Sequence, residues 1–204
     1  MVNFFQANRH NIRTAFPPNS LVIDIGCGAG QDLDQIRKYG WIAVGLDLDL
    51  SAVRVCSSNG FMAIQARAEA LPVKNNTADG LISNVTISYT NEFIALGEMA
   101  RVLKPGGRLY ISSHGIGYYL LYIFSPQSSF RQRIYGLRTV LNTWYYRCWQ
   151  LRLPSFWGDT LYQSEKTLQK YCPIHGLKII KTTIDRKFKL PIFMYNTVEK
   201  LNVL

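Results

Sequence analysis

The stretch Leu21–Gln31 reads LVIDIGCGAGQ, and it decides the fold of this 204-residue chain. Its first five residues are apolar apart from Asp24, which is typical of a strand buried on both faces of a parallel sheet. Glycines then occupy every second position, as Gly26, Gly28 and Gly30. Glycine lets the backbone turn sharply and lets a ligand lie against it, and the helix start beyond presents unpaired N–H groups that suit an anion. The stretch therefore predicts a cofactor-binding loop, called the glycine loop below (residues 26–30). Taken alone, the same stretch also fits an ordinary glycine turn between a strand and a helix.

The composition is that of a single globular domain over residues 1–204, with 48% hydrophobic and 18% charged residues. The four cysteines are scattered without metal-ligand spacing, which argues against a zinc site or a disulfide framework and indicates a reducing cytoplasm. The N-terminal residues lack the apolar core of a signal peptide. The apolar segment 109–124 contains polar residues and glycines and is shorter than the roughly 20 residues of a spanning helix, so we expect no transmembrane segment.

The net charge of +10 is unevenly distributed along the chain. Residues 1–100 carry 7 Lys+Arg and 9 Asp+Glu, a balance of −2, whereas residues 101–204 carry 16 and 4, a balance of +12. A basic second half indicates an anionic partner, which could be a phosphorylated substrate, a lipid surface or nucleic acid. A basic face that only keeps the protein soluble explains the charge equally well.

Apolar runs and helical patterns alternate along the chain, which predicts an α/β fold in which helices cover both faces of a parallel sheet. A helix over the cofactor mouth is expected within residues 1–20, ended by two prolines. Further helices are expected at residues 32–39, 52–58, 92–103 and 164–172. Strands are expected at residues 42–47, 61–66, 81–85, 108–112, 177–184 and 192–198, the last two as an antiparallel pair at the sheet edge.

Between residues 115 and 160 this alternation stops. The segment holds twelve aromatic residues and five interspersed arginines, and it is too long for a simple connection, so it predicts a helical insertion after the fifth strand. Aromatic rings offer apolar surface with polar tips, and arginine can bind a carboxylate or phosphate through two hydrogen bonds. We therefore expect residues 115–160 to form a cap that receives a small-molecule acceptor of anionic or amphipathic character.

Several segments, in this order and spacing, resemble the motifs of class I S-adenosylmethionine-dependent methyltransferases of the type 11-like group. The glycine loop has the spacing G-x-G-x-G rather than the G-x-G-x-x-G of dinucleotide sites, and Asp47 ends a strand 23 positions after Asp24. AEALP at 68–72, DGLISN at 79–84 and EMARVLKPGGR at 98–108 follow the family pattern. The resemblance covers roughly residues 20–112.

This resemblance implies a Rossmann-like seven-stranded sheet with its last strand antiparallel, and S-adenosyl-L-methionine bound at the carboxyl ends of the first strands. In such a site the glycine loop and Asp24 would hold the methionine portion, Asp47 the ribose hydroxyls, and Leu48 the adenine ring. The cofactor-binding residues implied are Asp24, Gly26, Cys27, Gly28, Gly30, Asp47, Leu48, Ala68, Glu69 and Asn84. One position departs from the family pattern, because Arg67 stands where relatives often have an aspartate that contacts the adenine amino group. No metal is implied.

The catalytic residues are expected to be few, since the sulfonium of this cofactor already activates the methyl group and the protein mainly aligns the acceptor. An oxygen or nitrogen acceptor can need a base to remove its proton. His114, directly after the fifth strand, and Tyr89, after the fourth strand where relatives commonly carry an active-site histidine, are the candidates. A hydrogen-bonded loop histidine and a tyrosine that only lines the site explain the same two residues.

The function predicted from the sequence is methyl transfer to a small, partly apolar acceptor, at oxygen. Methylation of RNA is an alternative, motivated by the basic second half, but it is disfavoured because Asn84 opens the sequence NVTI instead of an N-P-P-[YF]-type motif. A non-catalytic or membrane-peripheral binding module is the third possibility, with the arginines and aromatic residues of the insertion on an anionic lipid surface.

Overall fold

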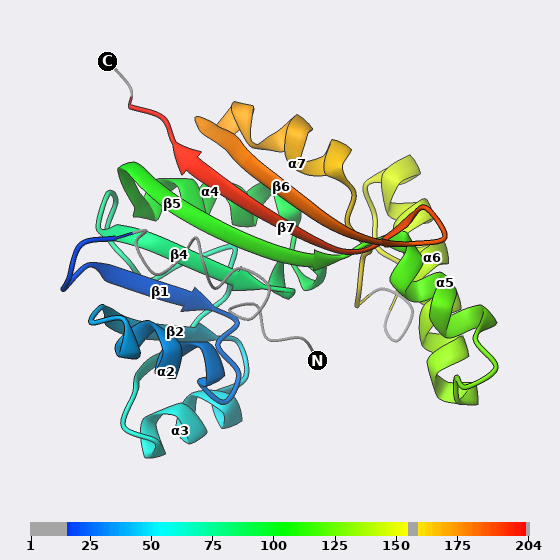
Figure 1. Cartoon of the computed structure of the whole chain (residues 1–204), viewed down its shortest axis with the longest axis horizontal. Helices are drawn as coiled ribbons and strands as arrows, with labels where there is room; N and C mark the ends of the chain where they lie inside the picture. Colours follow the sequence, from blue (N-terminus) through cyan, green and yellow to red (C-terminus); the bar gives the residue numbers. More distant parts are fainter. Residues whose placement is uncertain (1–15, 155–158, 203–204) are drawn as a thin grey trace.

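The computed structural model describes residues 16–154 and 159–202 (Figure 1). The helix expected within residues 1–20 falls largely outside them, and its described part, residues 16–20, forms turns rather than helix. No described helix is both long enough and apolar enough to cross a membrane.

Seven strands form one sheet in the order β3-β2-β1-β4-β5-β7-β6. The strands are β1 (Leu21–Ile25), β2 (Ile42–Asp47), β3 (Met62–Gln65), β4 (Ala78–Asn84), β5 (Leu103–His114), β6 (Leu177–Lys187) and β7 (Leu190–Lys200). The first five run parallel, whereas β7 is antiparallel to both of its neighbours, β5 and β6. This confirms the predicted Rossmann-like sheet with its last strand antiparallel.

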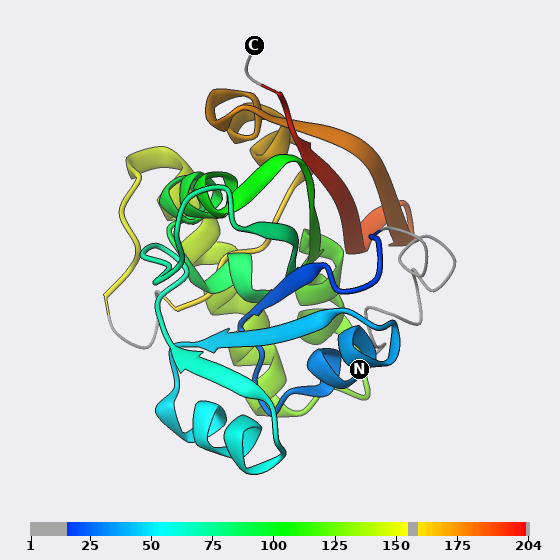
Figure 2. The same cartoon turned by 90° about the vertical axis from the view of Figure 1, so that its left-hand side faces the viewer.

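Helices cover both faces of the sheet, as expected, because β1 is apolar on both of its sides. Ile23 belongs to one hydrophobic cluster, with residues of α4 (Glu92–Val102) and α7 (Glu165–Tyr171). Val22, its neighbour in the strand, belongs to a second cluster, with residues of α2 (Gln31–Lys38) and α3 (Leu50–Ser58). Successive residues of a strand point to opposite faces, so both layers pack against β1. In the turned view of Figure 2, β1, β2 and β3 (blue to cyan) lie in front, with α3 below them.

Strand β5 begins earlier than the expected 108–112, and residues 104–107 lie within it as a bulge. Leu103 pairs with Ala78, but Arg108 already pairs with Gly80, so four residues of β5 are accommodated opposite one residue of β4. Gly106 provides the left-handed backbone that this bulge requires, with a φ of 74°. Pro105 and the two glycines after it shape a turn here without ending the strand pairing.

The predicted insertion contains two helices, α5 (Ile116–Phe124) and α6 (Phe130–Trp149), which form an antiparallel hairpin at one end of the molecule (Figure 1). Ser129 begins α6 with a capping box, since its side chain accepts from the Gln132 N–H and its own N–H donates to the Gln132 side chain. The two helices approach closely at Gly136, where a Cβ would lie 2.6 Å from the Tyr119 carbonyl oxygen. A helical insertion after strand five is therefore confirmed.

Candidate functional site

The glycine loop lies across the carboxyl end of β2. The Gly26 N–H donates to the Leu46 carbonyl oxygen at 2.7 Å, and the Gly28 N–H donates to Asp47 Oδ2 at 2.8 Å. Gly26, Gly28 and Gly30 all have positive φ, at 79°, 52° and 88°. A residue with a Cβ would be strained in this conformation, so the spacing of the three glycines is what allows the loop to reach Asp47.

Thr86 lies where a side chain at the first of these glycines would have to go. A Cβ on Gly26 would lie 2.0 Å from Thr86 Oγ1, and this hydroxyl donates to the Ile25 carbonyl oxygen at 2.8 Å. Thr86 begins the 3-10 helix η1 (Thr86–Tyr89), after a left-handed turn at Val85 with a φ of 65°. The sequence analysis did not single out Thr86, because only the packing of η1 against β1 brings the two together.

A cavity of about 350 Å³ opens beside the glycine loop, at the carboxyl ends of β1, β2 and β4. Seven of the predicted site residues line it: Gly26, Asp47, Leu48, Ala68, Glu69, Asn84 and Tyr89. The other lining residues are Ile25, Leu46, Ala66, Arg67, Thr86 and Thr90. Five predicted residues do not line it: Asp24, Cys27, Gly28, Gly30 and His114.

Asp47 is the main acidic acceptor of this cavity. Its Oδ2 accepts from Gly28 and its Oδ1 accepts from the Asp49 N–H at 2.9 Å, so both oxygens are fixed in place. Each carboxylate oxygen has a second lone pair, which leaves two acceptor sites for a ligand with neighbouring hydroxyl groups. A ribose presents such a pair of hydroxyls.

The lining of the cavity also includes apolar residues and a second acidic one. Leu48 is 59% exposed and Ala68 is buried, and both line the cavity, so they offer contacts for a flat ring. Glu69 accepts from the Asn91 N–H at 2.8 Å through Oε1, and its Oε2 lies 3.8 Å from Arg67 Nε. Arg67 therefore lies beside Glu69 at the position where the sequence departs from the family pattern.

Asp24 lies beneath the glycine loop rather than in the cavity. It is 1% exposed, and its Oδ1 has no hydrogen-bond partner among the described residues. Burial, followed by the neighbouring carboxylates of Asp32 and Asp47, holds the pKa of Asp24 well above its usual value. An acid in this setting favours its neutral form, unless a cation approaches it.

Asn84 is held in one orientation by neighbours on two elements. Its Nδ2 donates to Asp32 Oδ2 at 3.1 Å, and its Oδ1 accepts from the Ser112 hydroxyl. Asp32 and Ser112 were not predicted as site residues, since the chain of hydrogen bonds joins residues of α2, β4 and β5 that are far apart in sequence. These two hydrogen bonds hold the Asn84 side chain in place in the cavity wall where β4 ends.

The side chain of Cys27 points into the core. Its sulfur lies 3.8 Å from that of Cys56, and burial raises the pKa of the Cys27 thiol. The backbone N–H of Cys27 donates to Leu46, together with that of Gly26. Its contribution to a bound ligand would therefore come from the backbone of the loop and not from the thiol.

The two predicted catalytic residues lie in different surroundings. His114 ends β5 and stacks on Tyr118, with ring centroids 3.9 Å apart and planes 3° from parallel. Burial lowers the pKa of His114 to about 4, so its imidazole is neutral at pH 7 and a weak base. Tyr89 is 52% exposed and lines the cavity, and its hydroxyl lies 3.4 Å from that of Tyr135 on α6. The catalytic role of either residue stays a prediction.

A second cavity, of about 550 Å³, adjoins the first and shares Arg67, Glu69 and Tyr89 with it. The insertion contributes Tyr146, Gln150, Leu151, Arg152 and Asp159 to its lining. The Arg152 guanidinium donates to the carbonyl oxygens of Thr90 and Asp159, which holds its positive charge at this wall. The two cavities together offer a nucleoside-sized space next to a partly aromatic one that carries two arginines and two acidic residues.

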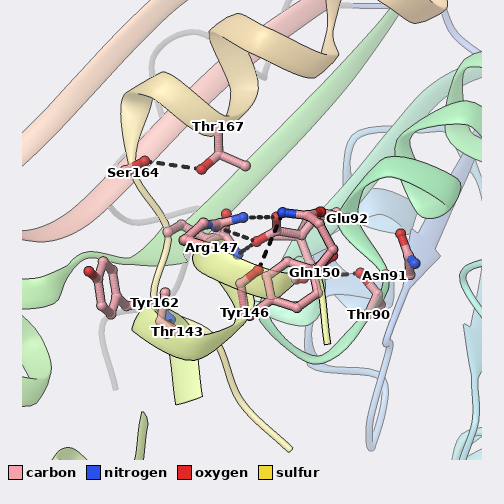
Figure 3. A network of polar contacts seen from close by, with 12 residues as sticks. Thr90, Asn91, Glu92, Thr143, Tyr146, Arg147, Gln150, Tyr162, Ser164 and Thr167 are labelled. Atoms are coloured by element: carbon pink, nitrogen blue, oxygen red, sulfur yellow. Dashed lines mark hydrogen bonds and ion pairs between the residues drawn. The ribbon is translucent and has the colours of Figure 1, made fainter. Parts of the chain in front are cut away.

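A buried ion pair fixes the insertion to the domain (Figure 3). Glu92 begins α4 and is fully buried, and Arg147 of α6 donates to both of its oxygens, at 2.6 and 2.9 Å. Gln163 donates to the same carboxylate. Sequence reasoning did not find this cluster, because Glu92 by itself looks like an ordinary acidic residue in the first turn of a helix.

Comparisons with known proteins agree with this geometry. Residues 23–111 match the family described as "Methyltransferase domain". A mouse tRNA (carboxymethyluridine(34)-5-O)-methyltransferase is 33% identical over 122 residues, which are 54% of this chain and 18% of the mouse protein. A demethylmenaquinone methyltransferase of Corynebacterium urealyticum is 33% identical over 101 residues, 49% of this chain and 44% of that protein. The malonyl-[acyl-carrier protein] O-methyltransferase of Buchnera aphidicola is 33% identical over 104 residues, 48% of this chain and 41% of that protein. The chain thus spans less than half the length of these curated relatives.

Solved structures share the fold over nearly the whole chain. A SAM-dependent methyltransferase from Methanosarcina mazei superposes with a TM-score of 0.68 at 16% identity, covering 93% of this chain and 96% of that one. Magnesium protoporphyrin IX methyltransferase from Synechocystis, solved with bound SAH, gives a TM-score of 0.67 at 14% identity, covering 97% and 81%. At sequence identities this low, the superpositions establish the shared fold alone.

Proposed function

We propose that the chain carries a class I S-adenosylmethionine-dependent methyltransferase domain and transfers a methyl group to an oxygen of a small, partly apolar acceptor. The observation that carries the proposal is the arrangement around Asp47. Its carboxylate is fixed by the glycine loop, and the same cavity has an apolar wall at Leu48. Beyond this cavity lies a second one, open to an acceptor.

The residues present fit the cofactor. Asp47 would accept from the ribose hydroxyls, Leu48 and Ala68 would contact the adenine, and Gly26 and Asn84 would face the methionine portion. The orphaned, buried carboxylate of Asp24 supports this fit, since a cationic amino group near the glycine loop would stabilise its charged form. When bound, the cofactor supplies a sulfonium-activated methyl group.

The protein then has to position an acceptor and exclude water. Tyr89 stands where the two cavities meet, so its hydroxyl can orient an acceptor between them. The described walls of both cavities contain no histidine, and His114 is too weak a base to favour proton removal at pH 7. A carboxylate acceptor needs no base, because it is already deprotonated at pH 7. Arg67 and Arg152 offer it positive charge in the second cavity, next to the acidic Glu69 and Asp159.

The names of two relatives also favour oxygen, since one is a malonyl-[acyl-carrier protein] O-methyltransferase and another a 5-O-methyltransferase of tRNA carboxymethyluridine. The second of these keeps RNA as a candidate acceptor. The balance of +12 in residues 101–204 favours the same alternative.

A transfer assay with cofactor labelled in its methyl group tests the proposal. Small carboxylic acids with a hydrocarbon portion are offered in one series and bulk tRNA in the other. We expect label on a small acid, released as methanol by mild alkali, because a methyl ester is alkali-labile. If the label appears in tRNA and not in the acids, the proposal of a small-molecule acceptor is wrong and RNA is the acceptor. A Tyr89→Phe variant should raise KM for the acceptor and leave cofactor affinity unchanged.

A further inference from the structure

Helix α6 has the reverse of the usual distribution of side chains on a surface helix. Its buried face is mostly polar and consists of Gly136, Arg138, Thr139, Asn142, Thr143 and Tyr146. The opposite face carries side chains at alternating spacings of four and three residues, called here the outward stripe: Phe130, Ile134, Leu137, Leu141, Trp144 and Cys148. A helix on the surface of a soluble domain normally buries its apolar face and exposes the polar one.

Hydrogen bonds fix the polar face inward. Asn142 Nδ2 donates to the Thr160 carbonyl oxygen at 2.8 Å, and its Oδ1 accepts from the Leu153 N–H at 2.9 Å. Thr143 Oγ1 accepts from the Tyr162 N–H at 3.0 Å. Rotation of α6 to bury the outward stripe would leave these groups without partners, at a cost for each. The orientation of the helix is therefore determined by its polar side.

The outward stripe is exposed along the helix. Phe130 is 76% exposed, Leu137 48%, Leu141 43% and Trp144 59%. Residues three and four apart are neighbours on a helix, so these side chains form one continuous apolar surface about 21 Å long. A scattered apolar residue on a surface is ordinary, but a continuous patch indicates an interaction site.

The charges of α6 indicate the kind of partner. All four of its charged residues are arginines, and no Asp or Glu occurs between residues 115 and 158. Arg138 and Arg147 point inward and pair with Asp159 and Glu92, and Arg133 donates to backbone carbonyl oxygens at the end of α5. Arg131 and Arg133 are the exposed ones, so the charge that α6 presents to solvent is positive and suits an anionic surface.

A second copy of the chain fits these charges poorly. The spacing of the stripe would suit pairing of two helices, but such pairs are usually stabilised by opposite charges beside the seam. Two copies of α6 would bring the exposed Arg131 and Arg133 together, and the helix has no Asp or Glu to pair with them. An acidic bilayer supplies opposite charge and an apolar layer at once, and aromatic residues such as Phe130 and Trp144 favour its headgroup region.

We propose that the outward stripe of α6 docks the protein on an anionic phospholipid surface, with the helix lying in the plane of the headgroups. Leu137, Leu141 and Trp144 would enter the boundary of the acyl chains, and Arg131 would contact lipid phosphates. This docking is independent of methyl transfer, since it needs neither cofactor nor acceptor.

Co-sedimentation with vesicles tests the proposal, using phosphatidylcholine vesicles with and without phosphatidylglycerol. The full chain should bind the acidic vesicles and lose binding at high salt. The double variant Leu137→Ser/Leu141→Ser should bind them about tenfold more weakly or worse, because two buried leucines are lost. Its thermal unfolding should match that of wild type, since both side chains are exposed in the free protein.

The matched control is Met62→Ser/Ile64→Ser, which removes two exposed apolar side chains from β3 at the far edge of the sheet. This variant should bind vesicles like wild type. Equal binding by wild type and by Leu137→Ser/Leu141→Ser would overturn the proposal. A wild-type dimer in light scattering that the same double variant converts to monomer would also overturn it, in favour of a second copy.

Fluorescence gives an independent readout. The emission of the exposed Trp144 should shift to the blue on acidic vesicles, and Trp144→Phe should lose much of this shift while it still sediments with the vesicles. Vesicle binding without any blue shift would place the membrane contact elsewhere and refute docking through α6.

Discussion

Arg147 and Glu92, 55 positions apart in sequence, form a two-point ion pair in which Nη1 lies 2.6 Å from Oε2 and Nη2 lies 2.9 Å from Oε1. Glu92 is fully buried, and the Arg147 side chain is 30% exposed. The pair joins α6 to the first turn of α4, directly after Thr90 and Asn91, next to both cavities (Figure 3). The shape of the proposed acceptor side therefore depends on a contact outside it.

Replacing Arg147 by Met should destabilise the protein strongly, because it leaves the Glu92 carboxylate buried without its cation. The expected loss in the free energy of unfolding is about 3–5 kcal/mol. The double variant Glu92→Leu/Arg147→Met should recover most of it. Urea denaturation measures both. Lys38→Met, which breaks the exposed Asp34–Lys38 pair, is the control and should cost less than about 0.5 kcal/mol. If Arg147→Met lowered the free energy of unfolding by as little as the control does, the Glu92–Arg147 pair would not stabilise the fold as described.

Gly26→Ala should be more harmful than Gly28→Ala. Both need an alanine in left-handed backbone, which costs about 1–2 kcal/mol, but only the first also clashes with Thr86. Thermal unfolding and binding of S-adenosylhomocysteine should both show the difference. Adding Thr86→Ala to Gly26→Ala should restore part of the stability. If the two glycine variants were alike, the contact with Thr86 would not limit this position.

Acid should destabilise the protein through His114. Its pKa is about 4 in the folded protein and about 6.5 when unfolded, so the unfolded chain takes up the proton first. The stability it contributes is complete above pH 6.5 and is lost as the pH falls toward 4. Between pH 7 and pH 5 the loss should be about 2 kcal/mol. His114→Phe should remove this part of the pH dependence, measured by urea denaturation at both pH values. An unchanged dependence would show that His114 titrates normally.

Asp24→Asn should stabilise the protein without cofactor and weaken binding of S-adenosylhomocysteine. A raised pKa of an acid means that its stabilising contribution is present below about pH 4 and is lost as the pH rises through the folded pKa. The advantage of the variant over wild type should therefore grow from pH 4 to pH 8. The exposed Asp34→Asn serves as the control and should show little change. An advantage that shrinks with rising pH would mean that Asp24 is ionised in the free protein.

The sequence predicts the parts of the structure that local patterns determine. Alternating apolar and glycine-rich segments specify β1, the glycine loop and the acid at the end of β2, so the place of Asp47 beside the loop could be predicted before the structure. Such patterns do not tell where a side chain points after its strand ends. His114 turns toward Tyr118, and Asp24 lies beneath the loop, because neighbouring elements pack there.

The insertion shows the same limit more clearly. Its helices were predictable, but the Glu92–Arg147 pair and the polar buried face of α6 depend on contacts with residues 153–163. The apolar spacing of the outward stripe is visible in the sequence and would ordinarily predict a buried face. Only the structure shows that this face is exposed.

The most direct test of the central assignment is isothermal titration of the full chain with S-adenosylhomocysteine. We expect one binding site, lost in Asp47→Ala and retained in Asp49→Ala, whose exposed carboxylate caps α3 and does not line the cavity. Circular dichroism confirms that each variant is folded. Absence of binding by folded wild type, or equal affinity of wild type and Asp47→Ala, would contradict the account.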